Sequence, residues 1–123
     1  MLKILVADDS RFQVALLTKA LREKGFEVVA AQDALQAGMI ALRTAPDAIV
    51  LDINMPGGSG IEVLKRLRRS TKTQSIPVVV VTGSGDSDIR QTALDLGVAD
   101  FLTKPVDLNQ LCGVLSKLLS RLV

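Results

Sequence analysis

The sequence contains no histidine, no tryptophan and no tyrosine, and it has a single cysteine among its 123 residues. Without histidine the chain cannot form His-based zinc sites, His-containing catalytic triads or a phosphohistidine of its own. The lone Cys112 lies on an amphipathic helical pattern, so we expect a buried thiol rather than a nucleophile or half of a disulfide. Aromatic residues make up 2% of the chain, so its core must be aliphatic.

Long apolar segments are also missing. No run approaches the roughly 18 residues that cross a bilayer, and the N-terminus shows none of the features of a signal peptide. These absences predict a cytoplasmic protein with no membrane partner. At about 150 residues per domain, the length predicts one domain over residues 1–123, and a hydrophobic content of 48% supplies its core.

Positive charge exceeds negative charge only slightly, with a formal net charge of +2. The densest cluster of cations, here called the basic segment 65–72, lies at the end of a predicted helix. We expect a solvated helix face whose cations suit a helix C-terminus. Direct nucleic-acid binding would need more charge or interleaved aromatic residues, and is not expected. The cations are Lys65, Arg66, Arg68, Arg69 and Lys72.

Five short apolar runs alternate with five helical patterns. The runs are rich in Val, Ile and Leu without clean alternation, which is typical of strands buried on both faces of a parallel sheet. Strands alternating with helices imply right-handed crossovers, so the pattern predicts an α/β fold with helices on both faces of the sheet. It leaves the strand order open. The runs cover residues 2–7, 27–31, 48–52, 77–82 and 99–102.

Helix start and stop signals flank these runs. Four Ser or Asp residues precede Gln or Glu by three positions, the spacing of a capping box, and two glycines sit where a left-handed C-cap is needed. The last helix carries one apolar stripe with spacings of three and four. The signals are Ser10/Gln13, Asp33/Gln36, Ser59/Glu62, Asp107/Gln110, Gly25 and Gly97, and the stripe is Leu108, Leu111, Cys112, Leu115, Leu118, Leu119 and Leu122.

Polar residues gather where the predicted strands end. Parallel strands end at the same edge of a sheet, and ligands bind in the crevice outside that edge. Each residue alone could be an N-cap, a turn residue or a solvated cation, but together they place carboxylates, a hydroxyl and an ammonium in one space. They are Asp8, Asp9, Asp52, Thr82 and Lys104.

Three carboxylates in one space repel one another unless a cation joins them, and a hard divalent ion leaves all three charged. Mg²⁺ accepts a few carboxylates, waters and a substrate phosphate, whereas zinc prefers His or Cys. Asp52 then becomes a candidate nucleophile toward a phosphoryl group, with Asp8 and Asp9 holding the metal. Lys104 and Thr82 can each contact a phosphoryl oxygen, and Gly83 leaves space beside the backbone.

These residues resemble the receiver domains of two-component response regulators over essentially the whole chain. The resemblance is carried by Asp8-Asp9, by Asp52 followed by Met55-Pro56-Gly57, and by Thr82-Gly83, Phe101 and Lys104-Pro105. It implies a doubly wound, five-stranded parallel sheet of flavodoxin-like (βα)5 topology, in the order 2-1-3-4-5.

The resemblance also implies roles for residues. Asp52 would accept phosphate from a histidine kinase or a histidine phosphotransfer protein, with Mg²⁺ bound by Asp9, Asp52, the backbone carbonyl of Asn54 and, commonly through water, Asp8. Thr82 and Phe101 would be the switch pair, and Lys104 would pair with the phosphate. Gly83, Ser84 and Pro105 would line the phosphate loop, with a cis bond before Pro105. The surface near 86–119 (helix 4, strand 5 and helix 5) would control a downstream target protein or output domain.

The sequence departs from the family at two places. Residues 55–60 read Met-Pro-Gly-Gly-Ser-Gly where the family commonly has Met-Pro-Gly-Met-Asp-Gly, and the extra glycine loosens this loop. Gly83 replaces a common alanine, followed by Ser84 at a position that influences water access to an acyl phosphate.

Two alternatives and one question stay open at this stage. A phosphatase of the haloacid dehalogenase type also uses an Asp nucleophile, but needs a second acid where this chain has Asn54. A degenerate receiver would act only as a protein-interaction module. The chain is either a stand-alone regulator or a receiver taken from a longer protein.

Overall fold

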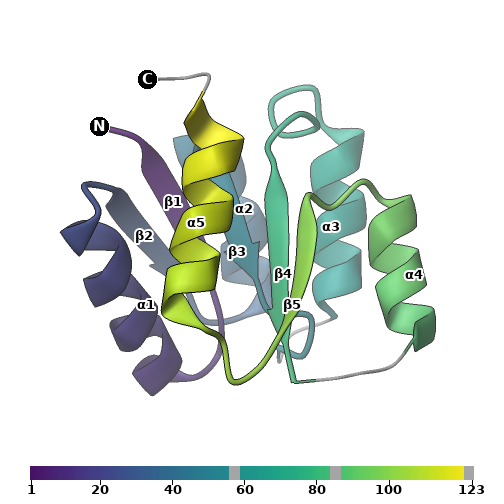
Figure 1. Cartoon of the computed structure of the whole chain (residues 1–123). Coiled ribbons are helices and arrows are strands. Elements are labelled where there is room, and N and C mark those ends of the chain that lie inside the picture. Colours follow the sequence, from purple (N-terminus) through teal and green to yellow (C-terminus); the bar gives the residue numbers. More distant parts are fainter. Residues whose placement is uncertain (56–58, 84–86, 121–123) are drawn as a thin grey trace.

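Five parallel strands form a single sheet in the order β2-β1-β3-β4-β5, in a computed structural model that describes residues 1–55, 59–83 and 87–120 (Figure 1). The predicted fold class and strand order are confirmed. Pro56, Gly57, Gly58, Ser84 and Leu122 lie outside the described residues. The strands are β1 (Lys3–Ala7), β2 (Glu27–Ala31), β3 (Ala48–Leu51), β4 (Val78–Thr82) and β5 (Asp100–Thr103).

The helices cover the sheet on both faces. Side chains of α1 and α5 pack with one half of the core, and those of α2, α3 and α4 pack with the other. Figure 1 shows α1 and α5 in front of the strands and α2 and α3 behind them. None of the helices in the described parts of the chain is long and apolar enough to cross a bilayer. The helices are α1 (Arg11–Glu23), α2 (Ala34–Thr44), α3 (Gly60–Arg69), α4 (Ser87–Asp95) and α5 (Leu108–Leu119).

The predicted helix caps are confirmed. Ser10, Asp33, Ser59 and Asp107 are the N-caps of α1, α2, α3 and α5, and each side chain accepts a hydrogen bond from the backbone N–H two or three residues later. At α2 the side chain of Gln36 also reaches back, and its Oε1 accepts from the backbone N–H of Gln32, one residue before the cap. Gly25 and Gly97 have φ angles of +92° and +76°, as the C-cap prediction requires.

The strands differ from the predicted runs by at most one residue at each end, and β2 coincides with its run. Pro77 lies outside β4 because it has no N–H to donate, although its carbonyl still accepts from Ile49. From Leu108 to Leu119 the apolar stripe of α5 faces the core as expected. Cys112 is buried within it, and burial raises the pKa of its thiol although the charge of Lys24 acts to lower it.

The basic segment 65–72 is only partly a solvated face, and the prediction is wrong for Arg68. Its guanidinium donates hydrogen bonds to four backbone carbonyls in the connections before β4 and after α4. Partial burial lowers the pKa of Arg68. The side chain therefore ties the end of α3 to two loops. The four acceptors are the carbonyls of Gln74, Ile76, Leu96 and Gly97.

Candidate functional site

The ends of the parallel strands bring the predicted polar residues to one edge of the sheet. Backbone hydrogen bonds fix each strand end on its neighbour: Asp8 donates to Ala31, and Asp52 donates to Ala7, at 3.0 and 2.9 Å. The backbone N–H of Lys104 donates to the carbonyl of Thr82 at 2.9 Å. Because these bonds continue the sheet, the backbone that carries these side chains is fixed to the neighbouring strands.

Three carboxylates meet at this edge. One oxygen from each of Asp8, Asp9 and Asp52 lies within 4.8 Å of the others. Asp8 and Asp52 are 3% and 4% exposed, whereas Asp9 is exposed to solvent. Two buried acids beside an exposed one form a site that is anchored in the core and open on one side.

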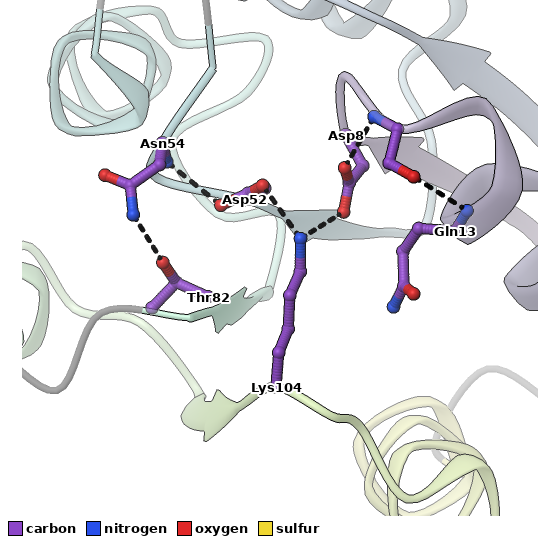
Figure 2. Close-up of polar contacts among 7 residues, drawn as sticks. Asp8, Gln13, Asp52, Asn54, Thr82 and Lys104 are labelled. Atoms are coloured by element: carbon purple, nitrogen blue, oxygen red, sulfur yellow. Dashed lines mark hydrogen bonds and ion pairs between the residues drawn. The ribbon is translucent and has the colours of Figure 1, made fainter.

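Lys104 joins two of these acids (Figure 2). Its Nζ lies 2.9 Å from Asp8 Oδ2 and 3.0 Å from Asp52 Oδ2. Burial by itself would lower the pKa of Lys104, but hydrogen bonds to Asp8 and Asp52 and their negative charges outweigh it and raise the pKa. The ammonium of Lys104 therefore offsets the negative charges of Asp8 and Asp52, while a divalent cation shared by all three acids stays a prediction.

The other carboxylate oxygens of Asp8 and Asp52 accept backbone hydrogen bonds. Ser10 donates to Asp8 Oδ1 and Asn54 donates to Asp52 Oδ1, both at 2.9 Å. The side-chain amide of Asn54 also donates to Thr82 Oγ1 at 3.2 Å (Figure 2). Thr82 is fully buried. Asn54 thus connects the acid at the end of β3 to the hydroxyl at the end of β4.

The chemistry of this donor set fits a hard divalent cation. All three side chains offer carboxylate oxygens, and no softer ligand lies in the cluster. Mg²⁺ accepts such oxygens and keeps several waters, and the exposed side of the cluster at Asp9 leaves space for them. Lys104 already contacts Oδ2 of Asp8 and Oδ2 of Asp52, so a cation bound by these two carboxylates would compete with its ammonium.

The other predicted residues lie at the same edge or beside it. Phe101, on β5, is 7% exposed, and the guanidinium of Arg90 on α4 lies 5.5 Å from the centre of its ring. The Lys104-Pro105 bond is cis, as predicted. Among the described atoms, a Cβ placed on Gly83 would meet nothing within 4 Å, so the backbone there borders open space.

Three residues at or near the site were not predicted from the sequence. Arg90 carries no motif, and its contact with Phe101 depends on how α4 packs. Within the described residues, the side-chain nitrogen of Gln13 is buried with no hydrogen-bond partner. Gly60, the first residue of α3, donates to the carbonyl of Ile53 at 2.8 Å. A Cβ on Gly60 would lie 2.5 Å from Ile53 Cα, so the glycine permits a close approach that the run Gly57-Gly58-Ser59-Gly60 could have suggested.

Comparison with known proteins shows the family to which the chain belongs. The family model described as the response regulator receiver domain matches residues 4–116. The chain belongs to this family of two-component signalling proteins. That membership removes the support for a phosphatase of the haloacid dehalogenase type.

Curated relatives and solved structures are consistent with the family. The chain is 35% identical over 118 residues to the phosphate regulon transcriptional regulatory protein PhoB of Pseudomonas aeruginosa, covering 96% of the chain and 52% of PhoB. It is 40% identical over 119 residues to the transcriptional regulatory protein PrrA of Mycobacterium leprae, covering 97% and 50%. It therefore spans about half the length of these relatives. The structure of the chemotaxis response regulator CheY4 of Vibrio cholerae matches with a TM-score of 0.88 at 28% identity, covering 96% of this chain and 98% of that one.

Proposed function

We propose that this chain is a phosphoacceptor of a two-component pathway, in which Asp52 receives a phosphoryl group from a histidine kinase or a histidine phosphotransfer protein. In this proposal residues 1–123 form one cytoplasmic receiver domain, which is a regulatory component and not an enzyme with a separate substrate. The observation that carries the proposal is the position of Asp52. It is buried at the sheet edge, within hydrogen-bond distance of Lys104 and close to two further carboxylates.

Asp52 is the nucleophile in the transfer. One carboxylate oxygen forms a bond to phosphorus while the bond between phosphorus and the donor's imidazole nitrogen breaks, and the electron pair of that bond returns to the imidazole. The hydrogen bond from Asn54 to Oδ1 orients the carboxylate, leaving Oδ2 on the side of Lys104. Lys104 and Thr82 then stabilise charge on the phosphoryl oxygens.

A Mg²⁺ ion would be held by Asp8, Asp9, Asp52 and the backbone carbonyl of Asn54, and when bound it neutralises charge on the phosphoryl oxygens. The carboxylates are the part of this set that the structure brings together. Gly83, Ser84 and Pro105 are proposed to border the phosphate.

The output surface is proposed to be α4, β5 and α5, switched by Thr82 and Phe101. Phe101 contacts the core on one side and Arg90 of α4 on the other. A rearrangement at Thr82 that moves the Phe101 ring would therefore also move α4. The controlled partner is a downstream protein or an output domain, which accords with the greater length of the curated relatives.

The phosphodonor partner is proposed to approach at the start of α1. Phe12, two residues after the N-cap Ser10 and three after Asp9, is 76% exposed, so an apolar side chain stands in solvent on the first turn of α1. An exposed Phe offers a large apolar contact to a protein that must reach Asp52.

Incubation with acetyl phosphate, followed by intact-mass measurement, tests the proposal. We expect one added phosphate in the presence of Mg²⁺, none after chelation of the metal, and none in Asp52→Asn. A protein that gains no phosphate under any of these conditions would instead be the degenerate receiver, an interaction module without phosphoryl chemistry. A phosphate retained by Asp52→Asn would place the acceptor elsewhere.

A further inference from the structure

An apolar stripe stands in solvent on the outer face of α2. Leu35, Met39 and Leu42 are 59%, 49% and 40% exposed, although α2 already buries its opposite side in the core. Their spacing of four and three residues puts them on one line along the helix. Exposed apolar residues are common singly, but three in line form a continuous surface that a partner can cover.

This stripe borders α3 directly. An added Cβ on Gly38 would lie 3.2 Å from Nη1 of Arg66, so the guanidinium of this α3 residue lies over the α2 backbone. Leu35 precedes Gly38 by three residues and Leu42 follows it by four, so both are its surface neighbours. Arg66 thus covers the seam between the helices, between two residues of the stripe.

Cations border the stripe on both sides. On α2, Arg43 follows Met39 by four residues, so the two are neighbours on the helix surface. On α3, Arg69 follows Arg66 by three residues and is its neighbour in the same way. All three arginines are exposed, and none donates to a carboxylate within the described residues. The facing acid of α3, Glu62, is already paired with Lys65 at 3.7 Å. The face therefore has an apolar centre and a positive border.

We propose that this face, formed by the α2 stripe and its arginine border, docks an amphipathic helix of a partner protein whose apolar residues are flanked by Asp or Glu. A helix laid along the stripe would cover it with residues spaced by three and four, and its acids would reach the arginines. A second copy of this chain is a poorer match, because it would bring arginines against arginines. The face lies on α2 and α3, apart from the proposed output surface of α4, β5 and α5, and the proposal is independent of phosphate on Asp52.

The test is titration of the isotope-labelled chain with a synthetic helical peptide of about 16 residues, long enough to form helix, carrying Leu in line and Glu at the flanking positions. We expect saturable shifts of amide signals confined to α2 and α3. A peptide with Lys in place of every Glu is expected to bind at least about tenfold more weakly, and rising salt should weaken the Glu peptide.

Matched variants locate the site. Met39→Glu is expected to weaken the Glu peptide about tenfold or more, because it places a like charge in the apolar centre. Leu94→Glu, on α4 and of similar exposure at 44%, should bind as the parent does. Arg43→Glu with Arg69→Glu should weaken binding, whereas Lys19→Glu on α1 should not. Far-UV circular dichroism confirms that each variant folds.

Several outcomes would overturn the proposal. Equal affinity for the Glu and Lys peptides would show that the arginines do not select acidic partners. A loss of affinity in Leu94→Glu as large as that in Met39→Glu would show that the peptide does not bind at the α2 stripe. Binding to vesicles containing phosphatidylglycerol, without binding of the peptide, would make the face a lipid surface. A dimer that Met39→Glu dissociates would make it an interface between copies of this chain.

Discussion

Lys104 and Asp52 are 52 residues apart in the chain, yet the lysine Nζ lies 3.0 Å from Asp52 Oδ2. The same Nζ reaches Asp8 at 2.9 Å, so one ammonium is shared by two buried carboxylates. The pair places a positive charge beside the proposed phosphoacceptor before any phosphate arrives. It also contacts both of the buried carboxylates that are proposed to bind a cation.

Lys104→Met should therefore bind Mg²⁺ more tightly than the parent chain. The substitution removes a competing cation from Asp8 and Asp52 while keeping the aliphatic stem, and we expect affinity to rise about tenfold. Isothermal titration with Mg²⁺ measures the change. Lys65→Met, which breaks only the exposed pair with Glu62, is the control and should leave the affinity unchanged. Unchanged or weaker binding in Lys104→Met would show that the lysine does not compete with the metal.

The same contacts predict a pH dependence of stability at the alkaline end. The folded-state pKa of Lys104 is raised above its ordinary value of 10.5, so its contribution is fully present below that value. It is lost as the pH rises through the folded-state pKa. Urea unfolding at a series of pH values should show the parent losing its advantage over Lys104→Met above about 10.5. A constant difference between the two chains across this window would contradict the coupling.

Gly60→Ala should disturb the end of β3, where Asp52 is held. The added Cβ would lie 2.5 Å from Ile53 Cα and 2.7 Å from the carbonyl oxygen of Asp52, so backbone must move. We expect a loss of about 1–3 kcal/mol in the free energy of unfolding, together with slower phosphorylation by acetyl phosphate. Gly113→Ala is the matched control, because a Cβ there meets nothing within 4 Å and the residue lies inside α5. It should gain about 0.5–1 kcal/mol. Equal effects of the two changes would show that the close approach of Gly60 to Ile53 and Asp52 is not needed for stability.

Local signals in the sequence were sufficient to predict most of the fold. The caps at Ser10, Asp33, Ser59 and Asp107 are contacts within a few residues, so their spacing is visible in the chain. The αL residue Ala45, with a φ of 45°, was not predicted, because it bears none of the glycine or asparagine chemistry that marks such positions. The strand order came from the family resemblance, since alternation alone leaves the arrangement of strands open.

Part of the site could likewise be predicted from the sequence and part could not. That the three acids lie together followed from parallel strands ending at one edge, a rule of topology. That Lys104 bridges Asp8 and Asp52 depends on distances set by packing, which spacing along the chain does not give. Arg68 shows the limit most clearly, because two of its partners are backbone carbonyls 28 and 29 residues away, and every residue has a carbonyl.

Arg68→Ala should destabilise the fold more than its neighbour Arg69→Ala. Removing the guanidinium leaves the carbonyls of two loops without their donor, at an expected cost of about 1–2 kcal/mol since the site is partly solvated. Arg69 is exposed and should change stability by less than about 0.5 kcal/mol. Urea denaturation of both variants measures the difference. Equal stabilities of the two variants would show that Arg68 contributes no more than a solvated cation, as the sequence predicted.

Locating the modified residue tests most directly whether Asp52 accepts the phosphoryl group. The chain is treated with acetyl phosphate and Mg²⁺, the acyl phosphate is reduced with borohydride, and the peptides are sequenced by tandem mass spectrometry. We predict a single reduced residue at position 52. A modification at Asp8, Asp9 or any other residue, with Asp52 unchanged, would show that Asp52 is not the phosphoacceptor.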